Sequence, residues 1–467
     1  MQNRIPSFSN KLLFILTAAA LSLPGADTGL DKYVHAPDPA YKYELVKTIP
    51  GSGFTTYVID LTSQQWRTAA DVNLPLWKHW LTIIRPDEVQ GTSGLLFISG
   101  GSVTSAMPAK PNPAYVDMAT ATHSVVAELS GIPNEPLTFT DEKRTRNEDA
   151  IIAYTWVKYL KTGDETWPLR MPMTKAAVRA MDTVTAFSAT AAGGGVNVEK
   201  FFVAGASKRG WTTWTTAAVD KRVIGFSPLV IDMLNMTKSF EHHFEAYGAY
   251  SEAINDYVEM GLMNVQYTPQ YTALMKLVEP FSYRDRYTMP KLIINAAGDQ
   301  YFLPDSSQFY FDQLPGEKYL RYVPNTNHSL ANSDARESLV AFYDAVLHDK
   351  PRPKFSWTFE KNGDIAVTCT DKPSEVKIWA ANNPDKRDFR LLTVGPAYKG
   401  TVLTSADGKV FIGHPDKPGK GWTAYFVELT FPSGTKYPFK FTTGVRVTPD
   451  TLPFTAPKAM GKVSDLP

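Results

Sequence analysis

Short apolar runs alternate with longer amphipathic stretches through the first two thirds of the chain. The runs that have the length and composition of buried strands are residues 94–99, 124–129, 200–204, 224–229, 292–295 and 318–323. The stretches with helical periodicity are residues 147–161, 173–192, 210–220 and 333–347. Strands that are apolar throughout and alternate with helices predict an α/β fold with a doubly wound, mainly parallel sheet covered on both faces.

Two segments depart from this alternation. Residues 237–289 are helical in pattern and rich in tyrosine and methionine, which predicts a cap or lid inserted between two strands of the sheet. After the Pro-Arg-Pro sequence at 351–353, alternating apolar and polar positions recur between turn residues. We therefore expect an α/β domain over residues 27–350 and a small C-terminal β-sandwich domain over residues 354–450.

The first 26 residues have the pattern of a secretory signal peptide. Arg4 and Lys11 form a positive region before an apolar run at 12–23, and this run is too short to span a bilayer. We expect a secreted or periplasmic protein, with an uncleaved membrane anchor as the alternative. After this segment we expect no transmembrane segment.

Charge and cysteine content narrow the possible partners. The formal net charge is +1, and it becomes −1 without the two basic residues of the first 26. Such a balance offers no basic surface for nucleic acid. Cys369 is the only cysteine, so no internal disulfide forms, and its place in an alternating run predicts a buried small side chain.

The sequence Gly205-Ala206-Ser207-Lys208-Arg209-Gly210 carries the clearest sign of chemistry. It follows an expected strand and precedes an expected helix, which is the setting of a nucleophile elbow in a hydrolase. Small residues before the serine allow the tight turn, and the helix start directs N–H groups at a developing oxyanion. An ordinary turn between a strand and a helix is the alternative.

A serine needs a histidine base, and the base needs an acid to orient it. Of eight histidines, only His328 lies in the loop directly after the last expected strand of the α/β region, where the chain order serine, acid, histidine requires the base. Asp299 directly follows the strand at 292–295 and is the expected acid. Asp305 is the competitor, for which capping of a helix is the other interpretation.

The oxyanion would be stabilised by backbone N–H groups. We expect one from Lys208, directly after the nucleophile, and a second from Gly101 or Ser102, in the loop after the strand at 94–99. The side chains of Lys208 and Arg209 are expected to be exposed cations at a helix start.

Aromatic residues of the cap are the expected substrate contacts, with Tyr247 and Tyr250 foremost and a packed cap core as the alternative. The pair His242-His243 suggests a metal, but no second group of ligands with suitable spacing lies nearby, so we expect neither metal nor cofactor.

Over most of its length the sequence resembles the PhoPQ-activated pathogenicity-related protein family. The resemblance rests on residues 148–156, 203–211, 295–305 and 324–328. It implies an α/β-hydrolase fold like that of prolyl-oligopeptidase catalytic domains and a secreted or envelope location, and it leaves the substrate open. The elbow also resembles the Gly-Cys-Ser-Arg-x-Gly elbow of glucuronoyl esterases, with Ala206 in place of cysteine, which favours a carbohydrate ester.

Two hypotheses follow. The first is a serine hydrolase acting through a Ser207 acyl-enzyme on a small-molecule, glycan or peptide substrate. An esterase is favoured over a peptidase because the chain lacks the propeller of oligopeptidases. The second is a non-catalytic signalling or binding protein on a hydrolase scaffold. The oligomeric state is open.

Overall fold

A computed structural model describes residues 27–416, 419–458 and 461–467. The expected signal peptide, residues 1–26, lies outside the described residues. Within the described part of the chain, no helix combines the length and the apolar composition needed to cross a membrane.

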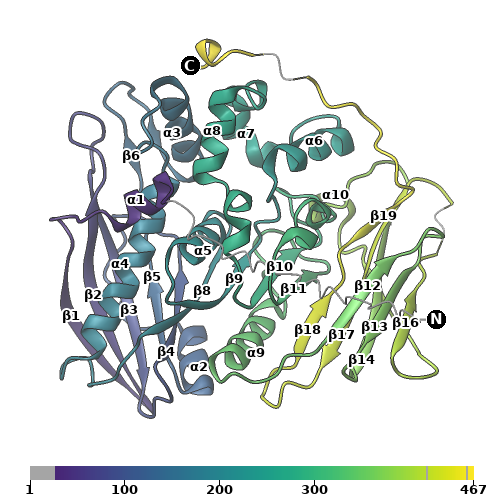
Figure 1. Cartoon of the computed structure of the whole chain (residues 1–467), viewed down its shortest axis with the longest axis horizontal. Coiled ribbons are helices and arrows are strands. Elements are labelled where there is room, and N and C mark those ends of the chain that lie inside the picture. The colour runs from purple at the N-terminus through teal and green to yellow at the C-terminus, as the bar shows by residue number, and fades with distance from the viewer. Residues whose placement is uncertain (1–26, 417–418, 459–460) are drawn as a thin grey trace, which may run out of the picture.

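A fourteen-stranded sheet runs through the whole molecule (Figure 1). Its strands follow the order β1-β2-β3-β5-β4-β8-β9-β10-β11-β18-β17-β14-β15, and β19 pairs with β17. The first nine of these in space are β1 (Lys42–Gly51), β2 (Phe54–Gln65), β3 (Leu76–Pro86), β5 (Val125–Leu129), β4 (Ser93–Ile98), β8 (Lys200–Ala206), β9 (Val223–Leu229), β10 (Lys291–Ala296) and β11 (Lys318–Val323). The six strands from β5 to β11 are parallel. The predicted α/β fold with a parallel centre is confirmed.

Helices cover both faces of this sheet. Those that pack directly on it are α2 (Pro113–Thr122), α4 (Arg170–Ser188), α5 (Lys208–Val219) and α9 (Ala335–Leu347), while α1 (Gly29–His35) packs on α4 and α3 (Glu148–Thr162) packs on the helices between β9 and β10. The buried side chains of α2 and α9 belong to one apolar cluster, and those of α3, α4 and α5 belong to the cluster on the other face. Both faces of the parallel strands are therefore buried, which explains why these strands are apolar at nearly every position.

The segment between β9 and β10 is helical, as its pattern predicts. It consists of α6 (Met236–Tyr247), η1 (Glu252–Ile254), α7 (Asn255–Glu259), η2 (Leu262–Asn264), α8 (Pro269–Val278) and η3 (Pro280–Arg286). In Figure 1 it lies above the edge of the sheet at which the parallel strands end. We call this segment the cap.

The C-terminal strands form two layers. The smaller layer contains β12 (Phe355–Phe359), β13 (Ile365–Cys369) and β16 (Val410–Gly413), and the larger contains β14 (Glu375–Asn383), β15 (Lys399–Val402), β17 (Trp422–Phe431), β18 (Phe439–Thr442) and β19 (Arg446–Thr448). Alternation along β13 turns Ile365, Val367 and Cys369 inward, so the cysteine is buried.

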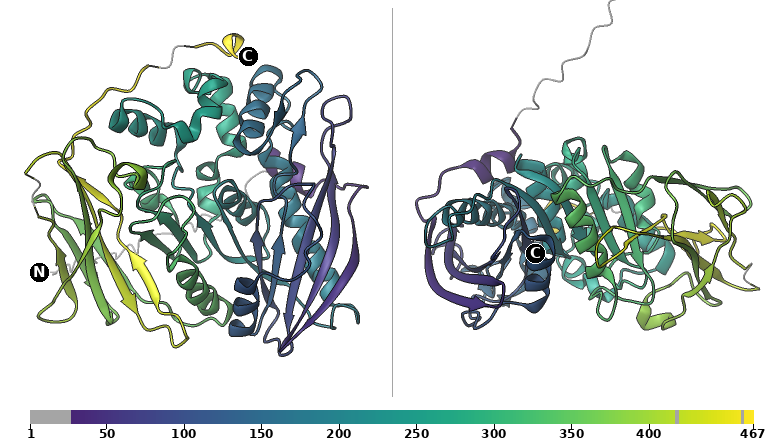
Figure 2. Two further views of the ribbon diagram at one scale, coloured as in Figure 1. Left: turned by 180° about the vertical axis from the view of Figure 1, so that it is seen from behind. Right: turned by 90° about the horizontal axis from the view of Figure 1, so that it is seen from below.

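The larger of these layers continues the central sheet. Strand β18 pairs with β11 through Leu320 and Thr442, so no break in the sheet separates the two expected domains. In both views of Figure 2 these strands lie at the opposite end of the molecule from the N-terminal strands. The boundary at 350–354 between two independent units stays a prediction.

Candidate active site

Ser207 occupies a sharp turn between β8 and α5. Its backbone has φ +58° and ψ −127°, a conformation that is unfavourable for a residue with a side chain and is found where surrounding structure enforces it. The Ser207 N–H donates to the carbonyl of Leu229 at the end of β9, at 2.8 Å. A Cβ at Gly205 would lie 2.7 Å from the Arg209 carbonyl oxygen, and one at Gly210 would lie 2.9 Å from that of Leu229. The turn therefore requires both glycines.

Asp299 and His328 meet beyond the ends of the neighbouring strands β10 and β11. Nδ1 of His328 lies 2.8 Å from Oδ2 of Asp299, whose side chain is 3% exposed. The other oxygen of Asp299 accepts from the Tyr301 N–H, and the His328 N–H donates to the side chain of Gln300. Because a carboxylate accepts hydrogen bonds, the bond to Asp299 favours the tautomer in which Nδ1 carries the proton and Nε2 is the acceptor.

Nε2 of His328 is buried and has no hydrogen-bond partner among the described residues. A bond from Ser207 to this nitrogen is therefore not formed in the structure. The rings of Tyr301 and Phe302 pack on the imidazole, with centroids at 4.3 and 5.9 Å, and both residues line a pocket together with Ser207. The nucleophile candidate and the histidine thus lie around the same two aromatic side chains.

Asp305, the competing acid, pairs with a different histidine. Nε2 of His242 lies 3.0 Å from both oxygens of Asp305, and Arg387 donates to the same carboxylate at 2.6 Å. Burial by itself raises the pKa of Asp305, but His242 and Arg387 outweigh burial and hold the pKa well below its usual range. The sequence did not indicate this buried trio, because Arg387 comes from the C-terminal region.

The second histidine of the pair has a structural partner too. His243 accepts the N–H of Ser251 at 2.9 Å, and burial lowers its pKa to about 3, so the ring is neutral. Among the described residues, no group of three or more histidine, cysteine, aspartate and glutamate side chains is arranged to hold a metal ion.

Of the expected oxyanion donors, Lys208 lies at the Ser207 pocket, while Gly101 and Ser102 do not. Lys208 is the first residue of α5, where backbone N–H groups have no partner within the helix, and it lines the Ser207 pocket. Gly101 and Ser102 line a separate pocket of about 280 Å³. The Ser102 N–H already donates to the hydroxyl of Ser105. Ser102 is thus not available as the second donor in this arrangement.

The side chains of Lys208 and Arg209 are not exposed, contrary to expectation. Lys208 is buried and its Nζ contacts Glu148 and, at 3.3 Å, Asp149. Arg209 holds the Glu148 carboxylate at 2.7 and 3.1 Å. Burial raises the pKa of Glu148, but its bonds with Arg209 and Lys208 outweigh this and lower the pKa to about 2. The acids at the start of α3 therefore serve as partners of the cations that directly follow Ser207.

The pocket at Ser207 is narrow and mostly apolar. It has a volume of about 30 Å³. Its apolar wall comes from α3, α5, the cap and the loop after β10: Trp156, Trp211, Met233, Met236, Phe240 and Phe302. Tyr257 of the cap lines it as well.

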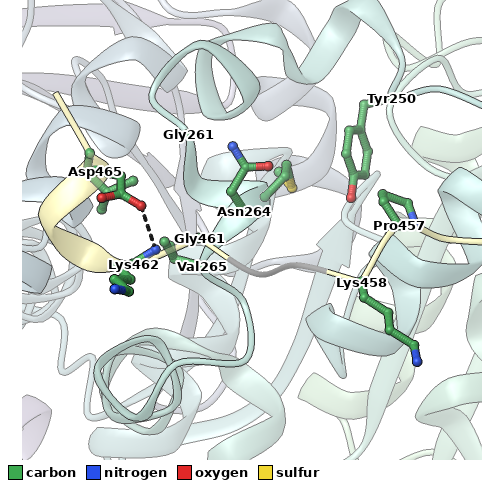
Figure 3. Close-up of a pocket in the computed structure, with 11 residues that line it drawn as sticks. Tyr250, Gly261, Asn264, Val265, Pro457, Lys458, Gly461, Lys462 and Asp465 are labelled. Carbon is green, nitrogen blue, oxygen red and sulfur yellow. Dashed lines mark hydrogen bonds between the residues drawn. The ribbon is translucent and has the colours of Figure 1, made fainter.

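Tyr247 and Tyr250 do not line this pocket, so the structure does not support them as contacts of a substrate at Ser207. The ring of Tyr247 lies under the guanidinium of Arg390, at 4.5 Å. Tyr250 faces a second pocket of about 200 Å³ between the cap and the C-terminal tail (Figure 3). The tail is bonded to the cap by the N–H of Phe454 to Glu245 and that of Gly461 to Asn264.

A loop of the C-terminal region supports both the acid and the histidine. The Leu391 N–H donates to the carbonyl of Gly298 at 2.9 Å, one residue before Asp299. Asn325, three residues before His328, exchanges two hydrogen bonds with the backbone of Tyr398, at 2.8 and 2.9 Å. We call residues 387–398 the support loop.

Comparison with known proteins gives one family and one curated relative. The family described as PhoPQ-activated pathogenicity-related protein matches residues 30–390. Autocrine proliferation repressor protein A of Dictyostelium discoideum is 39% identical over 472 residues, which cover 95% of this chain and 94% of that protein.

The solved structures that resemble this chain have lower sequence identity than the curated relative. Acetyl xylan esterase 1 of a Thermoanaerobacterium species is 12% identical, with 64% of this chain and 87% of that chain covered and a TM-score of 0.44. Acylaminoacyl peptidase of Pyrococcus horikoshii is 11% identical, with 66% and 50% covered and a TM-score of 0.40. A glucuronoyl esterase of Solibacter usitatus is 14% identical, with 68% and 91% covered and a TM-score of 0.39.

Proposed function

The chain belongs to the PhoPQ-activated pathogenicity-related protein family, and we propose that it is a serine hydrolase that cleaves an ester or amide bond through an acyl-enzyme on Ser207. The observation that carries this proposal is the placement of three groups at one edge of the sheet. Ser207 follows β8 in a strained turn, while Asp299 and His328, which follow β10 and β11, are hydrogen-bonded to each other. This is the chain order and strand placement on which α/β-hydrolases build a nucleophile, an acid and a base.

The chemistry assigns one role to each group. Oγ of Ser207 attacks the carbonyl carbon while its proton passes to Nε2 of His328. The bond from that carbon to the leaving atom then breaks, and the leaving atom takes the proton from Nε2. A water molecule, deprotonated by the same nitrogen, releases the acid and restores Ser207. Asp299 holds the imidazole in the required tautomer and stabilises its cation.

The start of α5 supplies the electrostatic support. In this proposal the N–H of Lys208 and the positive end of the helix dipole stabilise the developing oxyanion. We propose the N–H of Gly101, in the loop after β4, as the second donor.

An ester is the favoured substrate, and a peptide is the alternative. Secretion or periplasmic location stays part of the proposal, since it rests on residues 1–26. The test is hydrolysis of 4-nitrophenyl acetate by the wild type and by Ser207→Ala, His328→Ala and Asp299→Asn. Loss of kcat by about 10⁴-fold is expected for the serine and histidine variants. The control is Ser405→Ala, in an exposed loop, which should keep full activity. Equal activity of wild type and Ser207→Ala would refute the proposal.

A second candidate is a signalling protein, favoured by the name of the relative that is 39% identical, which describes an autocrine proliferation repressor. The two functions are separable. If signalling needs no catalysis, folded Ser207→Ala protein should repress the proliferation of responding cells as well as the wild type does.

A further inference from the structure

The pocket beside Ser207 has a wall that suits a small uncharged group. Its volume of about 30 Å³ holds about two water molecules, since one water needs roughly 10–15 Å³ of such space. Trp211 of α5 and Met236 and Phe240 of α6 contribute buried apolar surface to it. An acyl group with more than about three carbons beyond its carbonyl carbon exceeds this space unless the wall moves.

The charged groups in the wall are already partnered within the protein. The carboxylate of Asp149 accepts from the Tyr257 hydroxyl at 2.9 Å and lies 3.3 Å from Nζ of Lys208. Nη1 of Arg170 donates to the Lys208 carbonyl at 2.9 Å, and its guanidinium lies over the Trp211 ring at 4.2 Å. Arg170 is the exception, since its guanidinium bonds only to a backbone carbonyl and its Nε has no hydrogen-bond partner among the described residues. This free N–H can donate to an oxygen atom of a bound group.

The position of the pocket decides which part of a substrate it receives. The leaving atom must reach Nε2 of His328, which protonates it. The described residues that line the pocket include Ser207 and Lys208 but not His328, which Tyr301 and Phe302 cover. The group in this pocket is therefore the one that remains on Ser207 after the leaving atom has gone.

We propose that this pocket binds the acyl group and restricts the enzyme to uncharged acyl groups of two to four carbons, an inference that rests on the proposed function. Helix α6 of the cap sets the limit, because Phe240 closes the pocket over the acyl chain. Phe240 is a specificity-determining residue in this account, with no part in proton transfer.

Phe244 provides a matched control, because it lies one turn further along the same helix. Its ring packs on Tyr250 at 5.3 Å and does not line the Ser207 pocket. Phe240→Leu removes part of the pocket wall, while Phe244→Leu makes the same chemical change outside it.

The experiment compares kcat/KM for 4-nitrophenyl acetate, butyrate, hexanoate and octanoate, and for the mono-4-nitrophenyl ester of succinic acid, whose acyl group carries a carboxylate. For the wild type we expect acetate or butyrate to exceed octanoate by at least about tenfold, since each misfitted methylene is worth roughly 10-fold or more in an apolar pocket. Phe240→Leu should raise the hexanoate-to-acetate ratio by at least about fivefold. Phe244→Leu should leave that ratio unchanged.

Three results overturn the assignment while leaving the proposed function intact: octanoate turned over as fast as acetate, the succinate monoester preferred, or equal shifts from both phenylalanine variants. If Phe240→Leu does not fold, Met236→Val, which also widens the pocket, takes its place with the same expected shift. A folded protein that hydrolyses none of these esters and does not react with a fluorophosphonate refutes the proposed function itself.

Discussion

The buried ion pair between Arg387 and Asp305 provides a strong test of how the C-terminal region contributes to the fold. The side chains are 2% and 4% exposed, and the only other side chain that contacts the Asp305 carboxylate among the described residues is that of His242. Replacing Arg387 with methionine keeps most of the side-chain volume and leaves the carboxylate with one partner. Removing one partner of a buried pair costs about 3–5 kcal/mol, because the remaining charge stays desolvated.

A double-mutant cycle isolates the interaction energy between Arg387 and Asp305. Arg387→Met, Asp305→Asn and the double variant are unfolded in urea at pH 7, with tryptophan fluorescence as the signal. We expect Arg387→Met to lower the free energy of unfolding by about 3 kcal/mol or more, and the double variant to recover part of that loss.

The stabilisation that Asp305 provides depends on pH in a definite direction. The folded-state pKa of Asp305 is lowered, so the stabilisation is present above the unfolded pKa near 4 and is lost as the pH falls below it. A loss below about 1 kcal/mol in Arg387→Met at pH 7, or purely additive effects in the cycle, would refute the reasoning.

Three further predictions concern the cap, the elbow and the support loop. Burial raises the pKa of Glu279 to about 7, so the folded protein keeps a proton that the unfolded chain loses between pH 4.5 and 7. The free energy of unfolding, measured in urea, should therefore fall across this window by up to about 1.4 kcal/mol per pH unit, and Glu279→Gln should reduce this dependence on pH. Gly205→Ala should cost about 1–3 kcal/mol and slow fluorophosphonate labelling of Ser207, because the added methyl group meets backbone; unchanged labelling would contradict the clash. A glycine at position 325 can adopt the φ of +55° that Asn325 has, but Asn325→Gly removes both hydrogen bonds to the support loop. If the loop positions His328, kcat should fall about tenfold with KM nearly unchanged, and a change in KM alone would contradict this role.

The parallel core could be predicted from the sequence because its strands are buried on both faces. The runs at 200–204, 224–229, 292–295 and 318–323 lie within β8, β9, β10 and β11. Chain order then placed His328 and Asp299 at adjacent strand ends, and the structure brings these two side chains into contact. Their catalytic roles stay predictions.

The remaining features depend on contacts between distant segments. Lys208 and Arg209 look like solvated cations in the sequence, but their partner Glu148 lies about sixty residues earlier, at the start of α3. The pairing of β18 with β11 joins the C-terminal layer to the central sheet through a strand with an ordinary alternating pattern. Tyr247 looked like a substrate contact because it lies in the cap, yet the support loop covers its ring. No local sequence pattern indicates such distant partners.

The central claim is that Ser207 is an activated nucleophile. Its most direct test is reaction of the folded protein with a fluorophosphonate, followed by mass spectrometry of the peptides from the wild type, Ser207→Ala and His328→Ala. We expect a single adduct on Ser207 that is absent from Ser207→Ala and forms at least about 10³-fold more slowly in His328→Ala. Folded wild-type protein that stays unlabelled, or an adduct on another residue that survives in Ser207→Ala, would contradict it.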